Sequence, residues 1–406
     1  MKRIVGLDVG RGSAVLCCLD KFPHNIQKHY KLLRAAKKFY TVNCSRAGAD
    51  KLLSLKPQAI ILEPTVHGYS HFWVAIARQH NIKIYWVGHT DLAGQRKHYG
   101  FTNKRDEEDA LCLAACYFDP QFINEDGTSR FIKYYSNETI TNLRELFHEK
   151  EQLQKLRTAL VTQLRQRLSI EFPEAARRTM IISPVSGVTP FIYWLATTQE
   201  KTRYDNLYRQ SIAPELGIFI SDYTRKHAQA IIDIEVRYSD HLDQIEKIIS
   251  LAQFDDYNRV FDKFRFGTSC RAALLIHVFP IDRFLTNGKP LVEYEPSRDK
   301  LQKRNRSLSK FQAYLGLSFS YSISGNSKKR KFHGSSLVRS HLYGWAVCLA
   351  TRKDNVIGSE IGQIIGDRYH ELRKSVKGKD ALIRILFKVT RMLFYKLVNE
   401  CHNRKS

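Results

Sequence analysis

Four acidic residues stand at positions from which they could hold metal ions for phosphodiester chemistry. Asp8 lies among apolar residues in IVGLDVG, and Glu63 ends the apolar run AIILEPT. Asp106 and Asp109 in NKRDEEDA are three residues apart, so they share one face of a helix. Two metal ions that cleave a phosphodiester need about four carboxylates drawn from separate elements. The four acids therefore predict a two-metal site for Mg²⁺, for which Mn²⁺ can substitute.

Each acid also has an ordinary explanation when it is taken alone. Asp8 could be a turn residue, Glu63 could cap a strand before a proline, and acids in a first helical turn are favoured by the helix dipole. Glu107 and Glu108 are expected to point away into solvent. A strand acid, a strand-end acid and a helix pair in this order nevertheless favour the metal site.

The elements that must position these acids predict an α/β domain over residues 1–128. Apolar runs predict strands and one helix before the acidic helix, with a basic loop in front of it: strands 2–9, 14–19, 38–44, 59–65 and 82–88, and a helix over 69–79. Three strands followed by strand, helix, strand and helix are typical of a ribonuclease-H/RuvC-like fold.

The rest of the chain is predicted to be mostly α-helical. A leucine pattern over 137–172 indicates a long amphipathic helix, the core of a coiled-coil or dimerisation region at 129–262. Its partner could be the second helical stretch near 226–251 or another subunit. An irregular insertion is expected at about 178–225, and a third domain at 263–406, whose closing run ALIRILFKVTRMLFYKLV reads as core.

The charge of the chain points to a polyanionic partner. Lys and Arg number 65 against 40 acids, a net charge of +25, and nucleic acid is the leading candidate. The predicted contacts are Lys104, Arg105, Lys303, Arg304, Arg306, Lys328, Lys329, Arg330, Lys331 and Arg339. No apolar stretch approaches a membrane span, so a cytoplasmic protein is expected. Eight cysteines without a CxxC pair argue against a zinc ribbon or a disulfide framework.

Several motifs resemble one known family. GLDVG, LEPTVHGY and NKRDEEDA are similar to the acidic motifs of the DEDD, bridge-RNA-guided IS110-type transposases, which also include Piv-like DNA invertases. The resemblance covers roughly residues 1–120. A second match is YLGLSFSYSISGNSKKRKFHGSSLVRSHLYGWA, and FGTSCRAALLIHVF is a weaker one. The chain departs from the family where Arg105 replaces a small hydroxyl residue and where GLSF lacks a proline.

This resemblance implies a chemistry and a set of partners. Asp8, Glu63, Asp106 and Asp109 correspond to the metal-binding acids, and Ser324 in SISG corresponds to a nucleophilic serine that forms a covalent phosphoserine with DNA. The implied partners are double-stranded DNA of the element ends and target, and a non-coding guide RNA. A homodimer that assembles to a tetramer on synapsis is also implied. Without the resemblance, Ser324 would read as a turn residue.

Two other functions remain open from the residues alone. A structure-selective endonuclease, such as a junction resolvase, would use the same four acids with water as nucleophile and would not need Ser324. A nucleic-acid-binding protein without catalysis is disfavoured because the four acids and the serine are all present.

Overall fold

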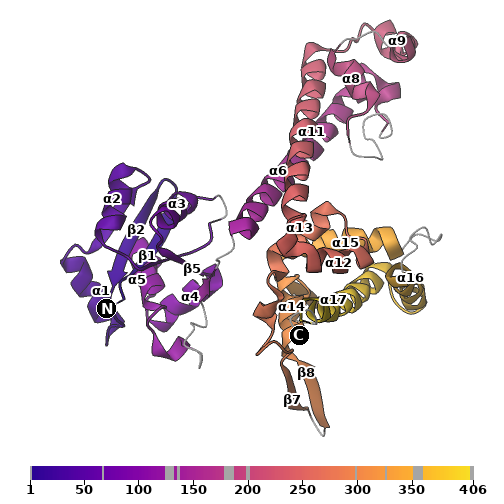
Figure 1. Ribbon diagram of the computed structural model, residues 1–406. Helices are drawn as coiled ribbons and strands as arrows, with labels where there is room; N and C mark the ends of the chain where they lie inside the picture. The colour runs from indigo at the N-terminus through magenta and orange to yellow at the C-terminus, as the bar shows by residue number, and fades with distance from the viewer. Residues whose placement is uncertain are drawn as a thin grey trace. The chain divides into compact units, whose positions relative to one another are not determined.

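The computed structural model describes residues 2–65, 68–123, 132–134, 138–177, 187–197, 202–297, 300–324, 327–350 and 360–402 (Figure 1). The chain forms two compact units, Met1–Glu138 and Thr139–Ser406.

The N-terminal unit is built on a mixed six-stranded sheet in the order β3-β2-β1-β4-β5-β6. β1 runs antiparallel to β2 and parallel to β4, which in turn runs parallel to β5. The strands are β1 (Ile4–Gly10), β2 (Ser13–Leu19), β3 (Phe39–Asn43), β4 (Ala59–Leu62), β5 (Lys83–Val87) and β6 (Ile132–Tyr134).

Helices cover both faces of this sheet because successive residues of each strand point to opposite sides. The helices are α1 (Ile26–Ala35), α2 (Arg46–Ser54), α3 (His71–Gln79), α4 (His89–His98) and α5 (Asp106–Ala115). Val5 and Leu7 of β1 share a core with residues of α2 and α3. Ile4 of β1 and Ile61 of β4 pack with α1 and α5 on the other side. The acids of α5 and the helix pair α2–α3 therefore lie on opposite faces of the sheet.

The mixed α/β architecture agrees with the prediction, and its strand order is consistent with a ribonuclease-H-like start. The prediction of a basic loop before the acidic helix is wrong over 89–98, which form α4. That helix has little apolar periodicity, since it buries mainly Leu92 and Gln95 and contains Gly94. Its pattern is therefore too weak to distinguish a helix from a loop in the sequence.

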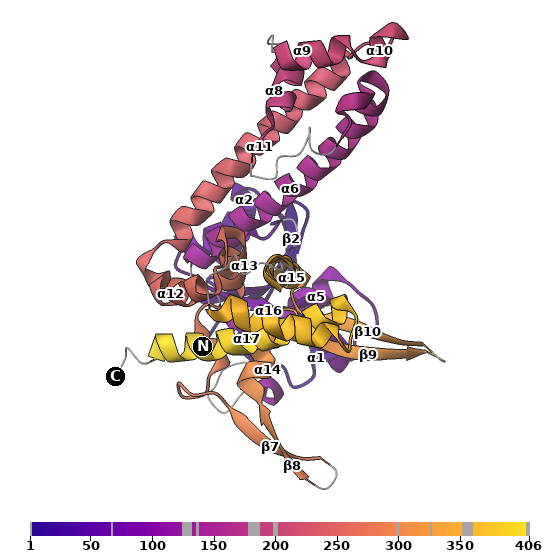
Figure 2. The same cartoon turned by 90° about the vertical axis from the view of Figure 1, so that its right-hand side faces the viewer.

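Two long helices dominate the start of the C-terminal unit, α6 (Glu138–Glu171) and α11 (Asp222–Ile249). They lie side by side and antiparallel (Figures 1 and 2). Arg157 of α6 pairs with Glu235 of α11 at 2.5 Å, and Glu171 accepts a 2.9 Å hydrogen bond from the Ser221 hydroxyl at the start of α11. The second helical stretch of the same chain is thus a neighbour of the leucine-patterned helix.

The segment predicted to be an irregular insertion at 178–225 is helical over much of its described part. It holds α8 (Pro190–Thr197), α9 (Thr202–Arg209) and α10 (Ile212–Glu215). Phe191 and Trp194 of α8 pack against the rings of Phe172 and Tyr204, in tilted and edge-to-face contacts, in a core of their own. Short helices punctuated by Pro190, Gly187 and Pro214 look irregular in sequence, which explains the wrong prediction.

The remainder of the C-terminal unit is a helical body with two β-hairpins (Figure 2). Its helices are α12 (Asp255–Phe264), α13 (Thr268–Val278), α14 (Arg306–Tyr314), α15 (Ser336–Ala350), α16 (Glu360–Arg373) and α17 (Gly378–His402). The hairpins are β7 (Val292–Ser297) with β8 (Lys300–Asn305), and β9 (Ser318–Ser324) with β10 (Ser327–His333). α17 is core, as predicted. No helix within the described ranges is long and apolar enough to span a membrane.

Candidate functional site

Asp8 of β1 points to the face of the sheet that α5 covers. Gly6, two residues earlier, lies on the same face, and α5 crosses directly above it. A Cβ on Gly6 would overlap the carbonyl oxygen of Ala110 and lie 2.6 Å from the amide nitrogen of Ala114. Only glycine permits this close approach. The missing side chain therefore lets the start of α5 reach Asp8.

Glu63 reaches the same face from the neighbouring strand. β1 and β4 pair in parallel with Leu7 opposite Leu62, so Glu63 follows the strand beside Asp8. Glu63 lies two residues after Ile61, so its side chain points to the same face of the sheet, on which Ile61 packs with α5. Carboxyl ends of adjacent parallel strands are where sites of α/β sheets usually form.

Asp106 and Asp109 occupy the first turn of α5, as predicted. Asp106 begins the helix and is exposed, whereas the side chain of Asp109 is only 3% exposed and accepts a hydrogen bond from the guanidinium of Arg96 on α4. A buried carboxylate needs such a partner. One acid of the pair is thus fixed inside the domain, and the other remains open to solvent.

The four acids interact electrostatically at Asp8. Burial, and after it the charges of Asp109, Asp106 and Glu63, raise the pKa of Asp8 to about 7, while the charge of Lys104 opposes them. Like charges around a half-buried carboxyl disfavour its ionised form. Asp109, Asp106 and Glu63 therefore lie near enough to Asp8 for their charges to disfavour its ionised form.

The four acids are not closed around an ion. Among the residues that the structure describes, no three His, Cys, Asp or Glu side chains are close enough together to hold a metal ion. Carboxylate oxygens are nevertheless the ligands that Mg²⁺ prefers, and mutually repelling carboxylates are stabilised by a cation. The donor set therefore fits a divalent metal.

Of the two glutamates between the aspartates, Glu108 is buried, contrary to the prediction, and Glu107 is partly exposed. Glu107 accepts a 3.1 Å hydrogen bond from the Tyr30 hydroxyl and pairs with Arg34 at 3.3 Å. Glu108 is buried, and within the described structure its Oε2 has no hydrogen-bond partner. Burial raises the pKa of Glu108, while the charge of Arg105 lowers it. Helix α5 packs so closely on β1 that Glu108 and Asp109 of its first turn are buried.

Two residues of α4 beside the acids were not foreseen. His89 contacts Glu63, with 3.1 Å between Nδ1 and Oε2, and Arg96 pairs with Asp109. The two are seven residues apart and so lie on one face of the helix. This spacing of basic residues is the signal that could have found them, had 89–98 been recognised as a helix.

Ser324 is the last residue of β9, and its backbone pairs with Ser327 of β10. The side chains of Ser324, Lys328 and Lys329 lie outside what the structure describes. Ser324 belongs to the C-terminal unit and the four acids to the N-terminal unit.

The other predicted nucleic-acid contacts are in varied surroundings. Lys104, Arg105, Lys303, Arg304 and Lys331 are exposed. Three others have protein partners: Arg306 pairs with Glu293 at 2.7 Å, Arg330 with Asp380 at 3.8 Å, and the Arg339 guanidinium donates to the Gly316 carbonyl at 2.6 Å.

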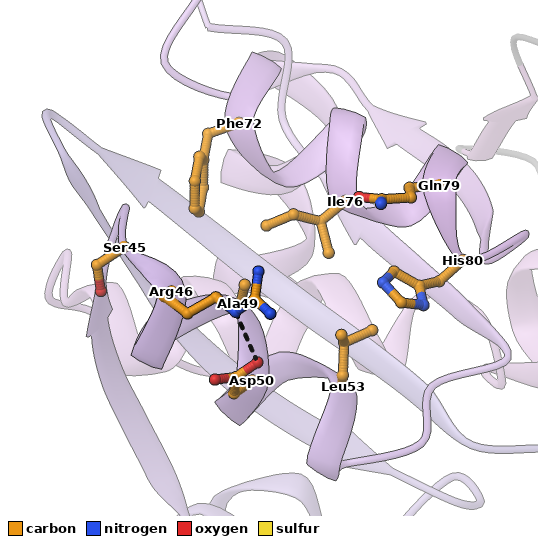
Figure 3. A pocket seen from close by; sticks show the side chains of 9 residues that line it. All are labelled: Ser45, Arg46, Ala49, Asp50, Leu53, Phe72, Ile76, Gln79 and His80. Atoms are coloured by element: carbon orange, nitrogen blue, oxygen red, sulfur yellow. Dashed lines mark ion pairs between the residues drawn. The ribbon is translucent and has the colours of Figure 1, made fainter.

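A cavity of about 460 Å³ opens between α2 and α3, away from the acids (Figure 3). Its only ion pair in the figure joins Arg46 and Asp50, which are one turn apart on α2 and highly exposed. Because α2 and α3 cover the sheet face opposite α5, this cavity does not belong to the acidic site.

A family model matches the first part of the chain. Residues 5–173 match the family model of the IS110-type DEDD transposases, described as a transposase. The matched range includes all four acids and ends before Ser324. No curated protein gave a match to the chain.

Proposed function

Since the chain belongs, through residues 5–173, to the IS110-type DEDD transposases, we propose that it cuts and rejoins the DNA of an insertion element through a covalent phosphoserine. The family implies a DNA-cutting and rejoining enzyme in general terms. Metal-dependent cutting is supported by one observation, the interaction of three acids with the half-buried Asp8, whereas the serine step rests on the resemblance of SISG to the family's motif.

In this proposal Asp8, Glu63, Asp106 and Asp109 hold Mg²⁺ in a ribonuclease-H/RuvC-like domain. Bound there, the metal would polarise the scissile phosphate and lower the charge that builds up during attack. Arg96 and His89 keep Asp109 and Glu63 oriented, and Gly6 lets α5 present its two aspartates to the strand acids.

Ser324 is the proposed nucleophile. A bond forms between its Oγ and phosphorus as the bond to the leaving deoxyribose oxygen breaks; the serine proton passes to a base and the leaving oxygen takes up a proton. Attack by the hydroxyl of another strand reverses the step and rejoins the DNA, so no ATP is needed. A guide RNA, a homodimer that becomes a tetramer and a nucleoid-associated location belong to the same proposal.

A denaturing-gel search for a covalent protein–DNA adduct tests it. The protein is incubated with Mg²⁺, the RNA that flanks its gene and a nicked element-junction DNA. We expect an adduct with the wild type and none with Ser324→Ala or Asp106→Asn. Ser322→Ala, in the same strand, and Glu107→Gln, in the same helical turn but paired with Tyr30 and Arg34, are the matched controls and should retain it.

The alternative is distinguished in the same gel. Cleavage without an adduct that survives Ser324→Ala but not Asp106→Asn would show a hydrolytic, resolvase-like nuclease and refute the serine assignment. Cleavage that survives Asp106→Asn would refute the metal site.

A further inference from the structure

Two aromatic rings, in edge-to-face contact, and two guanidinium groups pack together where the β9–β10 hairpin joins the helical body. Phe319 and Phe332 are paired across the two strands, with ring centroids 5.8 Å apart. The guanidinium carbon of Arg330 lies 4.9 Å from the Phe319 ring centre, and that of Arg339 lies 4.8 Å from the Phe332 ring centre. The four side chains form a column with a cation at each end.

The protein holds this column in place. Gly334, just after β10, has a φ of +83°, and a Cβ there would lie 3.0 Å from the Cα of Gly316. The two ends of the hairpin therefore touch through backbone alone. Arg339 donates to the Gly316 carbonyl, and Phe319 meets Phe387 of α17 with 6.1 Å between ring centroids. The column is thus preorganised and does not need a ligand to form.

A hollow of about 550 Å³ opens beside this column. Both apolar and charged side chains line it: Phe319, Arg330, Val376, Asp380, Ile383, Arg384 and Phe387. Arg330 is fixed by Asp380 at 3.8 Å. Phe319 remains 37% exposed, and Arg384 on α17 is also exposed. The contact between Phe319 and Phe387 anchors the hairpin. That contact requires neither an exposed Phe319 ring nor a second arginine beside it.

We propose that this hollow binds one unstacked nucleotide of single-stranded DNA. The base would stack on the layer formed by Phe319 and Arg330, and the phosphate would contact Arg384. Aromatic rings and guanidinium planes stack on any base without reading its sequence, and the volume is within the range of small-ligand pockets. An apolar partner would cover Arg384 without supplying a counter-charge.

The choice of DNA rests on the proposed function. The hairpin that forms the column also carries Ser324, and breaking a strand there would release the neighbouring base from its stack. A pocket at the base of the hairpin would hold that displaced nucleotide while strands are exchanged.

Binding of a short oligodeoxynucleotide with a single 2-aminopurine tests the inference without any cleavage. The protein carries Ser324→Ala and no divalent metal is added. We expect the 2-aminopurine emission to rise as the base leaves its neighbours. Phe319→Leu should weaken binding about 5- to 100-fold, the loss typical of removing one stacked base, and Phe319→Trp should restore it.

Arg384→Gln keeps the test valid if Phe319→Leu disturbs the fold. Arg391→Gln, on the same helix about 10 Å further along, removes the same charge outside the hollow and is the matched control. We expect Arg384→Gln to weaken binding and to reduce the emission change more than Arg391→Gln does. Equal effects of the two arginine variants, or wild-type binding by Phe319→Leu, would overturn the inference.

Binding of an oligoribonucleotide of the same sequence is measured for comparison with the DNA. Binding of RNA alone with the same dependence on Phe319 would overturn the choice of DNA. Because no strand is cut, a negative adduct gel leaves this result interpretable, and a failure here leaves the serine mechanism untouched.

Discussion

The two units each bury a cluster of charged side chains, and the clusters differ in their balance of charge. In the N-terminal unit four acids act on one another around Asp8. In the C-terminal unit the fully buried Lys150 of α6 places its Nζ 2.5 Å from Glu151 and 3.3 Å from the hydroxyl of Ser269 on α13. Glu151 is also 3.1 Å from His341 of α15.

The surroundings shift the pKa values of Asp8 and Glu151 in opposite directions. Burial and the neighbouring acids raise the pKa of Asp8 to about 7. Burial also opposes ionisation of Glu151, but hydrogen bonds from His341 and Lys150, together with their charges, outweigh it and lower its pKa to about 2. The Lys150 cluster is electrostatically complete and joins three helices of the body. The acid cluster is incomplete without a cation, which is the property expected of a functional site.

The largest change in stability should come from breaking the Lys150 cluster, in which the charges are balanced. Glu151→Gln leaves the ammonium of Lys150 buried without a counter-charge, so we expect the free energy of unfolding to fall by about 3–5 kcal/mol. Urea unfolding at pH 7 measures it. Glu149→Gln, two residues earlier in α6, with a side chain 57% exposed, is the control and should change little. An equal effect of both variants would mean that Lys150 finds another partner.

In the N-terminal cluster, the same change of an acid to its amide should raise the free energy of unfolding. Asp8→Asn removes a half-buried charge that three other acids repel, so we expect it to stabilise the metal-free protein by about 2 kcal/mol at pH 8. Thermal unfolding in a chelating buffer measures the shift. The exposed Asp50 provides the control substitution Asp50→Asn. Destabilisation by Asp8→Asn would show that the acids are not in mutual repulsion.

The two clusters also differ in how far the sequence could predict them. Asp8 and Glu63 stand on apolar strands whose parity and order follow from the pattern of IVGLDVG and AIILEPT, so their convergence was predictable. Arg96 was missed because α4 lacks an apolar face. Lys150 reads as a solvated helix residue, and its burial arises from Ser269 and His341, which are more than a hundred residues away. Contacts of that range depend on packing between helices, which local periodicity does not encode.

Divalent metal should stabilise the protein through the acid cluster alone, and this change in the free energy of unfolding should be smaller. Mg²⁺ that binds only the folded acids stabilises the protein by about 1.4 kcal/mol at ten times its dissociation constant. We expect this gain in the wild type and in Glu151→Gln alike, and its loss in Asp8→Asn. Thermal unfolding with increasing Mg²⁺ measures it, and the same concentrations of Ca²⁺ and of NaCl at matched ionic strength test selectivity. A gain that persists in Asp8→Asn would place the metal elsewhere.

The smallest effect is the loss of the stability contributed by the Lys150 cluster as the pH falls. Because the pKa of Glu151 is lower in the folded protein than in the unfolded chain, its contribution is fully present above about pH 4.5 and is lost as the pH falls towards 2. The stability difference between wild type and Glu151→Gln should therefore narrow by about 1 kcal/mol between pH 5.5 and 3, after allowance for solvent screening. Other acids titrate over this range, but they are common to both proteins and cancel in the difference. Urea unfolding at four pH values measures it. A difference that stays constant with pH would mean that Glu151 is not held ionised by Lys150 and His341, and the contrast with Asp8 would then lie in burial alone.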